Sequence, residues 1–323
     1  MAATRSALLA ATALAFLGTE AAAVTWDVSL WGKRRAFTEH VEKLAELVSE
    51  KTGGEFTLNI SYGGLSKPRE NLDNISFGAI QMAQFCAGYH PDKNPSITVL
   101  ELPFLGVESL EEERRVSMAV YDHPAVAEDL ARWNATLLMP SPMPQYNLVG
   151  VGEKPSSLSE FEGLSVRATG GIGEAMEAVG AIPTSMSATE VRQALDSGVV
   201  KAVAFAPHAH MAFGTVNTGE WWTTNLNPGT VNCPVVANSD ALASLSDAHR
   251  EALLGSIDEA LDHYVDNYLN NTMERWGPTL EEEIAAFRDK VAAPAAEAWI
   301  EENAARGLPA QELYDLVTSE IAK

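Results

Sequence analysis

A single arginine interrupts an apolar strand pattern near the middle of the chain. Residues 164–168 alternate as a short β-strand does, and Arg167 is the one charged member. Three glycines between Gly170 and Gly173 then open a helical pattern, whose first N–H groups favour negative charge. A guanidinium also presents two parallel donors that fit a carboxylate. The segment therefore predicts a site for an acid group, with Arg167 and Gly170 as contacts.

Short motifs follow one another in a fixed order around this arginine. The strand reads Gly163-Leu164-Ser165-Val166-Arg167, and it is followed by Gly180–Pro183, by Glu190-Val191 and by Gly198–Val200. This order resembles the substrate-binding proteins of TRAP transporters (tripartite ATP-independent periplasmic transporters, C4-dicarboxylate type). The N-terminal half agrees more loosely, and the resemblance covers nearly all of the chain after residue 23.

The resemblance implies both a fold and a function. The fold is α/β, two-lobed like other periplasmic binding proteins, with an interdomain cleft and a long domain-spanning C-terminal helix. The function is that of an extracytoplasmic receptor, not an enzyme, which binds an organic acid and delivers it to membrane permease subunits. In this family the arginine at the position of Arg167 holds the acid group. No cofactor is implied, and we expect a monomer.

The resemblance also implies residues that line the cleft. Trp31 and Tyr89 stand where relatives line the cleft, Trp222 precedes the strand that returns to the first lobe, and Lys67 and Asn227 occupy cleft-facing positions. A ligand with an apolar or aromatic body would suit aromatic walls. The alternative for each aromatic residue is packing in a core or lobe interface, and for Lys67 and Asn227 it is a solvated surface.

Two departures from the family bear on the ligand. Many relatives have a second arginine about twenty residues before the first, where this chain has Asn147. Many also have a ligand-contacting asparagine where this chain has Phe205 or Ala206. We therefore expect a carboxylate or sulfonate with one acid group and a bulky apolar or aromatic body, rather than a small dicarboxylate.

The N-terminus and the charge indicate the compartment. Residues 1–23 begin with a charge, continue through an apolar run and end in Ala21-Ala22-Ala23, which is typical of a cleaved secretory signal peptide. We expect a periplasmic protein. The net charge is −22 for the 323 residues and stays there after cleavage, because the removed segment holds one Arg and one Glu. Such acidity argues against nucleic acid and anionic lipid as partners.

Two cysteines, Cys86 and Cys233, are the only ones in the chain. An oxidising compartment permits a disulfide, but two cysteines so far apart carry no framework signature. Two buried free thiols are therefore the favoured interpretation, and a bridge is the alternative.

The chain alternates between strand and helix patterns, as an α/β protein does. Lobe I is expected to comprise residues 24–145 and 234–272, and lobe II residues 146–233 and 273–323. Strands are expected at 24–30, 56–62, 82–85, 97–100, 136–139, 148–152, 164–168, 199–205 and 233–238.

A long apolar helical pattern runs from Asp247 to about Tyr268 and resumes from Thr279. One interpretation is a single domain-spanning helix with a kink at Pro278. The other is a helical hairpin broken at Gly277-Pro278.

Other functions have weaker support. His208 and His210 could begin a metal site, but no third ligand is close in sequence, and residues two apart diverge on a helix. Residues 170–173 (GGIG) lack the dinucleotide-binding spacing and a Walker lysine. A binding protein of the ABC transporter type, or an extracytoplasmic enzyme on a similar scaffold, remain the alternatives.

Overall fold

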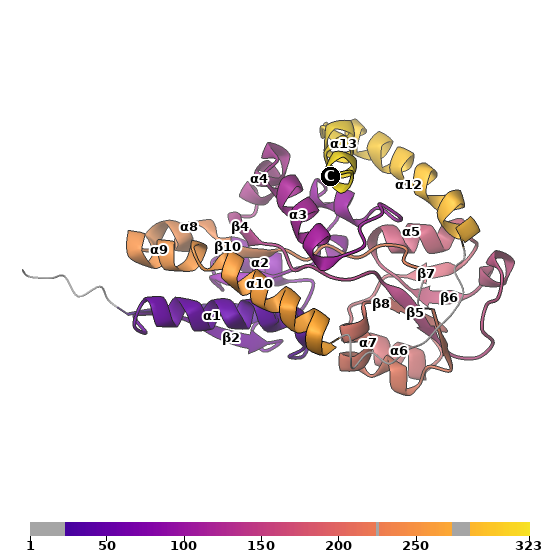
Figure 1. Ribbon diagram of the computed structural model, residues 1–323, viewed down its shortest axis with the longest axis horizontal. Coiled ribbons are helices and arrows are strands. Elements are labelled where there is room, and N and C mark those ends of the chain that lie inside the picture. The colour runs from indigo at the N-terminus through magenta and orange to yellow at the C-terminus, as the bar shows by residue number, and fades with distance from the viewer. Residues whose placement is uncertain (1–22, 224–225, 273–284) are drawn as a thin grey trace, which may run out of the picture.

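The computed structural model describes residues 23–223, 226–272 and 285–323. They form two five-stranded mixed sheets with flanking helices, one sheet in each of two lobes (Figure 1). This confirms the expected two-lobed α/β fold. The predicted signal peptide lies outside the described residues, apart from Ala23. In the described part, no helix is both long and apolar enough to cross a bilayer.

The first sheet has the strand order β2-β1-β3-β10-β4. Its strands are β1 (Val24–Leu30), β2 (Phe56–Tyr62), β3 (Met82–Gln84), β4 (Ala135–Met139) and β10 (Val235–Asn238). Alternate residues of β1, namely Trp26, Val28 and Leu30, are buried, as the period of two predicts. The strand β10 arrives from the second lobe and runs antiparallel between β3 and β4. It therefore ties the later part of the chain into the first lobe.

The second sheet has the order β7-β6-β8-β5-β9. Its strands are β5 (Asn147–Gly150), β6 (Ser165–Arg167), β7 (Ile182–Thr184), β8 (Ala202–Phe205) and β9 (Trp221–Trp222). The strand β6 lies between β7 and β8 and is parallel to both. Arg167 is its last residue, so the arginine leaves the carboxyl edge of the sheet, where α/β proteins commonly bind ligands.

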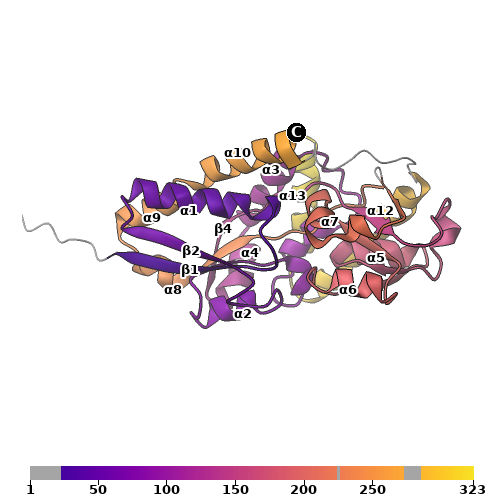
Figure 2. The ribbon, with the colours of Figure 1, turned by 90° about the horizontal axis from the view of Figure 1, so that it is seen from below.

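Helices cover both sheets. The α-helices are α1 (Glu39–Lys51), α2 (Asn71–Ser76), α3 (Leu110–Tyr121), α4 (Pro124–Ala131), α5 (Gly170–Ala178), α6 (Val191–Asp196), α7 (Pro207–Phe213), α8 (Ser239–Ser244), α9 (Asp247–Leu254), α10 (Ile257–Asn267), α12 (Ala285–Ala305) and α13 (Ala310–Ile321). Short 3₁₀ turns are η1 (Ala36–Thr38), η2 (Ala87–Tyr89), η3 (Ile97–Glu101), η4 (Leu158–Phe161) and η5 (Thr215–Asn217). Figure 2 shows α1 and α10 side by side over β1 and β2.

One strand prediction is wrong. Residues 97–100 form the 3₁₀ turn η3 rather than a strand. Two main-chain bonds begin the turn, from Ile97 N–H to Asn94 O and from Thr98 N–H to Pro95 O. A short apolar run that is buried on all sides has no periodicity that separates a strand from a helical turn.

The long C-terminal pattern is not one helix. It is divided at Gly255 and Ser256 into α9 and α10, and a π-helical turn, η6 (Tyr268–Thr272), follows. The π-helical turn that follows α10 contacts the second lobe, because the Tyr268 hydroxyl lies 3.0 Å from Nδ1 of His208. Gly277 and Pro278 lie outside the described residues.

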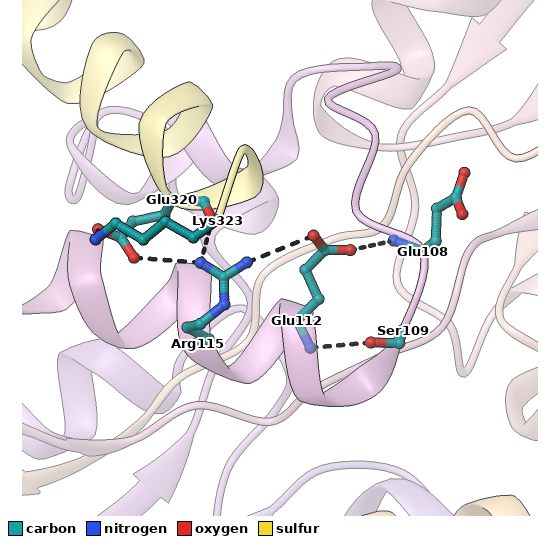
Figure 3. A network of polar contacts seen from close by, with 6 residues as sticks. All are labelled: Glu108, Ser109, Glu112, Arg115, Glu320 and Lys323. Atoms are coloured by element: carbon teal, nitrogen blue, oxygen red, sulfur yellow. Dashed lines mark hydrogen bonds and ion pairs between the residues drawn. The ribbon is translucent and has the colours of Figure 1, made fainter.

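The last helix returns to the first lobe. The helix α12 packs against α5, whereas α13 packs against α3 (Figure 1). Figure 3 shows the polar side of this contact, where the Arg115 guanidinium lies between Glu112 of its own helix and Glu320 of α13. Ser109 caps α3 by accepting the Glu112 N–H at 3.1 Å. These contacts fix the C-terminus on the lobe from which the chain started.

The two cysteines are bridged. Cys86 follows β3 and Cys233 precedes β10, so the antiparallel pairing of these strands places the two residues opposite each other, with Cα atoms 3.9 Å apart. The expectation of two free thiols is therefore wrong. A separation of 147 residues gives no hint of this neighbourhood, which only the strand order creates.

Candidate ligand-binding site

A pocket lies between the lobes, and its unfilled space, counted together with the solvent at its mouth, is about 400 Å³. The first lobe supplies the loop after β1 and the turn η2, and the second supplies the ends of β6 and β8 and the helix α7. Seven of the seventeen lining residues are aromatic, counting His208. The lining residues are Trp31, Arg35, Phe37, Cys86, Gly88, Tyr89, Met143, Tyr146, Arg167, Thr169, Ala188, Phe205, His208, Ala209, Phe213, Val231 and Cys233.

Arg167 enters this pocket from the end of β6 and is 2% exposed. Its Nε and Nη2 donate to the main-chain oxygen of Met186 at 3.2 and 2.9 Å, and Nη1 donates to Ala204 O at 3.1 Å. The guanidinium lies 4.6 Å from the ring centroid of Phe205. No carboxylate of the described residues forms an ion pair with it. A buried charge held only by neutral groups is costly, so the site favours an anion.

Tyr89 reaches Arg167 from the first lobe. Its hydroxyl oxygen accepts Nη2–H of Arg167 at 3.2 Å and the N–H of Ala188 at 3.1 Å. Its ring lies 5.9 Å from that of Trp31. This single side chain thus links the two lobes at the cation.

Trp31 forms part of the opposite wall at the end of β1. The side chain is buried, and its Nε1–H has no hydrogen-bond acceptor within the described part of the protein. A buried indole N–H usually has a partner, so this donor is available to a bound molecule.

Arg35, which we did not predict, is a second buried cation in the pocket and is 8% exposed. Nη1 donates to the main-chain oxygens of Trp31 (3.2 Å) and Lys33 (2.7 Å). The guanidinium lies 4.6 Å from the Trp31 ring and 4.8 Å from the Phe37 ring. Burial lowers the pKa of Arg35 to about 10, so the side chain is still cationic at neutral pH.

The sequence holds little that could have revealed this residue. Arg34 and Arg35 are adjacent in a loop without periodicity. Arg34 is exposed and pairs with Glu42, whereas its neighbour turns inward. Packing against three aromatic side chains decides which of the two is buried, and those rings meet only in the folded protein. Phe37, Met143, Tyr146, Thr169 and Phe213 were missed for the same reason.

The two histidines of α7 point to different places. His208 lines the pocket, stacks on Phe37 with ring centroids 5.5 Å apart, and contacts the Tyr268 hydroxyl through Nδ1. His210 instead contacts Thr215 and the main-chain oxygen of Asn147. Burial lowers the pKa of both, so both are neutral at pH 7. Within the residues that the structure describes, no three side chains of metal-binding type come together.

Five of the residues proposed for the ligand site lie outside this pocket. Asn147 and Asn227 bond to each other at 3.2 Å, and Oδ1 of Asn147 also accepts from Thr223 and from the main chain of Leu226. These bonds connect Asn147 to Thr223, Leu226 and Asn227. Lys67 is exposed and pairs with Glu70. Trp222 is half-buried on the edge strand β9, away from the pocket lining.

Gly170 lies outside the pocket lining, next to the carboxyl group of Glu101. Its φ is +55°, and a Cβ placed there would lie 2.0 Å from Oε2 of Glu101. The first lobe thus places a carboxyl group against the start of α5, and burial raises the pKa of this carboxyl to about 7. Trp31, Tyr89, Arg167 and Phe205 are the proposed residues that the structure brings together.

Comparison with known proteins identifies the family. Residues 28–305 match the family described as bacterial extracellular solute-binding protein, family 7. The chain belongs to this family. The match covers most of the chain, and it confirms the resemblance to TRAP solute receptors that the sequence motifs indicated.

Solved structures of TRAP solute-binding proteins and of an extracytoplasmic solute receptor share the fold. A marine metagenome TRAP solute-binding protein specific for aromatic acid ligands, in complex with 3-hydroxybenzoate, is 20% identical with a TM-score of 0.82, covering 93% of this chain and 98% of that one. A TRAP solute-binding protein of Rhodoferax ferrireducens with copurified benzoate is 16% identical with a TM-score of 0.81, at the same coverage. A Bordetella pertussis extracytoplasmic solute receptor binding pyroglutamic acid is 20% identical with a TM-score of 0.79, covering 91% and 99%.

Proposed function

We propose that this protein is the extracytoplasmic receptor of a TRAP transporter and that it binds an organic acid between its lobes. The observation that carries the proposal is the Arg167 guanidinium. It is buried in an interlobe pocket, is held by neutral groups and has no protein carboxylate paired with it in the described chain. A ligand carboxylate or sulfonate would supply the missing negative charge.

The body of the ligand is proposed to be apolar or aromatic. Trp31, Phe37, Phe205 and Phe213 present rings to the same small pocket. Related structures were solved with 3-hydroxybenzoate and benzoate, and one related receptor binds pyroglutamic acid. Each of these ligands is a compact acid with a single carboxylate, which agrees with the expectation of a monoacid.

Binding is proposed to serve capture and delivery, not catalysis. After export with loss of residues 1–23, the receptor would close on its acid and dock on permease subunits in the membrane. Contact between Tyr89 of the first lobe and Arg167 of the second supports a site completed by both lobes.

The division of the chain between the lobes also remains a proposal. Sheet membership supports residues 24–145 with 234–272 in lobe I and residues 146–233 in lobe II. Residues 273–323 were assigned to lobe II, and the packing of α12 on α5 supports that part of the assignment. The packing of α13 on α3 favours lobe I for residues 310–321.

A thermal-shift screen against organic acids tests the proposed function. A ligand at 100 times its dissociation constant adds about 2.7 kcal/mol to the free energy of unfolding. We expect monoacids with a flat or bulky body to raise the melting temperature, and their neutral amides, such as benzamide beside benzoate, to have no effect. Equal shifts from acids and amides would contradict a site built around a cation.

A further inference from the structure

We infer that Arg35 is a second ligand contact, which binds an oxygen acceptor on the part of the ligand remote from the acid group held by Arg167. The inference rests on the proposed function and narrows it. The ligand class becomes a compact acid whose apolar body carries a second oxygen. A hydroxyl there keeps the proposed monoacid, whereas a second acid group would replace it with a diacid that has an aromatic body.

The pocket contains two buried cations, whereas a single acid group on the ligand would neutralise only one of them. Arg35 and Arg167 both line it and both are buried, while no Asp or Glu side chain is among the lining residues. The two arginines therefore make the pocket positively charged, although the protein as a whole has a net charge of −22. A ligand with one charged end would leave the second cation facing only aromatic rings and main-chain oxygens.

Arg35 also has donor capacity to spare. Nη1 is committed to two main-chain oxygens, but the buried Nε–H has no acceptor within the described residues. The Nε1–H of the neighbouring Trp31 is likewise buried and has no acceptor within the described residues. Two buried donors without partners, beside one another in a pocket wall, match an oxygen acceptor in a bound molecule.

The two cations reach the pocket from different lobes. Arg35 lies in the loop after β1, 5.4 Å from the ring of Phe213, and Arg167 lies 4.6 Å from the ring of Phe205. These two rings are in contact, with centroids 5.8 Å apart. A ligand that touches both guanidinium groups must therefore carry its two oxygen-bearing groups at separate points of a body that packs against the rings.

Three benzoate derivatives test this assignment by calorimetry: benzoate, 3-hydroxybenzoate and isophthalate (benzene-1,3-dicarboxylate). A hydrogen bond to a charged group corresponds to roughly a 10- to 100-fold change in dissociation constant. We expect wild type to bind 3-hydroxybenzoate or isophthalate at least about tenfold more tightly than benzoate. Comparison of the two shows whether the second oxygen is neutral or charged.

The variant Arg35→Met removes the donors and keeps the aliphatic bulk. In this variant we expect 3-hydroxybenzoate and isophthalate to bind about as tightly as benzoate, so the ratio of dissociation constants falls to about one. The affinity for benzoate itself should change less. The matched control is Arg34→Met, since Arg34 is exposed and pairs with Glu42, and it should keep the wild-type preference. If Arg35→Met does not fold, Arg35→Gln takes its place, because its shorter side chain does not reach the same position.

Three results would contradict the inference, and they separate it from the proposed function. If wild type binds benzoate as tightly as 3-hydroxybenzoate and isophthalate, the role of Arg35 is overturned and the proposed function stands. A preference that survives Arg35→Met or Arg35→Gln shows that Arg35 only supports the loop. Failure of wild type to bind any of the three acids overturns the proposed ligand class together with this inference.

Discussion

Arg167 and Arg35 place two positive charges in a pocket of a strongly acidic protein, and no Asp or Glu side chain is among its lining residues. The overall charge of −22 repels an approaching acid at long range, but salt limits this repulsion to a Debye length of about 8 Å. Inside the pocket the balance is reversed, because guanidinium groups act at contact distance in a poorly solvated site. We therefore expect these two residues, rather than the surface charge, to decide the affinity for an acid.

Buried titratable groups predict how stability depends on pH. Burial raises the pKa of Glu101 to about 7 and that of Glu113 to about 8. A carboxyl with a raised pKa binds more protons in the folded state, so its contribution to stability falls as pH rises above 4.5. Burial lowers the pKa of His40 and His210 to about 3 and of His90 to about 4. These histidines destabilise the fold as pH drops below 6.5.

The two effects together predict maximal stability at about pH 6.5 to 7. Melting temperatures between pH 5 and pH 9 measure it. In Glu113→Gln, which cannot ionise, we expect a smaller loss of stability between pH 7 and pH 9, whereas Glu111→Gln on the exposed side of α3 should follow wild type. A melting temperature that rises steadily to pH 9 would show that the buried carboxyls do not control the alkaline side.

At the scale of elements, the disulfide links β3 of the first lobe to the segment that runs from the second lobe into β10. Cys233 precedes β10, and its bond to Cys86 also forms part of the pocket wall. Replacing both cysteines with alanine should lower the free energy of unfolding by about 2–4 kcal/mol, as expected for a bridge that closes a long loop. Chemical denaturation measures this change.

Reduction provides the control for that experiment. Wild type in dithiothreitol should unfold at the same denaturant concentration as the double alanine variant, and the variant should not respond to dithiothreitol. Equal stability of the oxidised wild type and the double variant would mean that the pairing of β3 with β10 holds this connection between the lobes without the covalent bond.

The elements were largely predictable from sequence where periodicity was strong. The strand expected at 24–30 appears in the structure as β1. The η3 turn was mistaken for a strand, because a fully buried run has no polar face to reveal its period. The break between α9 and α10 was missed, because the apolar pattern continues across Gly255 and Ser256.

The pocket was only partly predictable. Arg167 was found because a charge in an apolar strand stands out, and Trp31 and Tyr89 were found through resemblance. Arg35 lies in a loop, where burial depends on rings contributed by distant segments. Gly170 was misleading, since the Glu101 side chain of the other lobe lies against it and leaves it outside the pocket lining. Tertiary contacts of this kind leave no local pattern in the sequence.

For the whole molecule, contacts across the pocket indicate how the lobes close. Arg69 donates to the Ser185 hydroxyl at 3.0 Å, Lys33 donates to Ala212 O at 3.3 Å, and Tyr89 meets Arg167. A ligand that touches both lobes stabilises this arrangement over a more open one. We expect the radius of gyration in solution scattering to decrease on addition of saturating ligand.

The Arg167→Ala variant, given the same ligand concentration, is the control and should show no decrease. An unchanged radius in wild type at saturation would mean that ligand enters a cleft whose lobes do not move.

The central claim is that Arg167 holds the acid group of the ligand, and calorimetric titration of an acid found in the screen tests it most directly. Removing one partner of a buried charge pair costs about 2–5 kcal/mol, so Arg167→Ala should weaken binding roughly 30-fold or more. Arg167→Lys should not restore the affinity, because an ammonium cannot keep the guanidinium's bonds to Met186 and Ala204 while it also contacts the acid group. The exposed Arg132→Ala should bind as wild type does. Folded Arg167→Ala with unchanged affinity would contradict the account and place the acid group elsewhere.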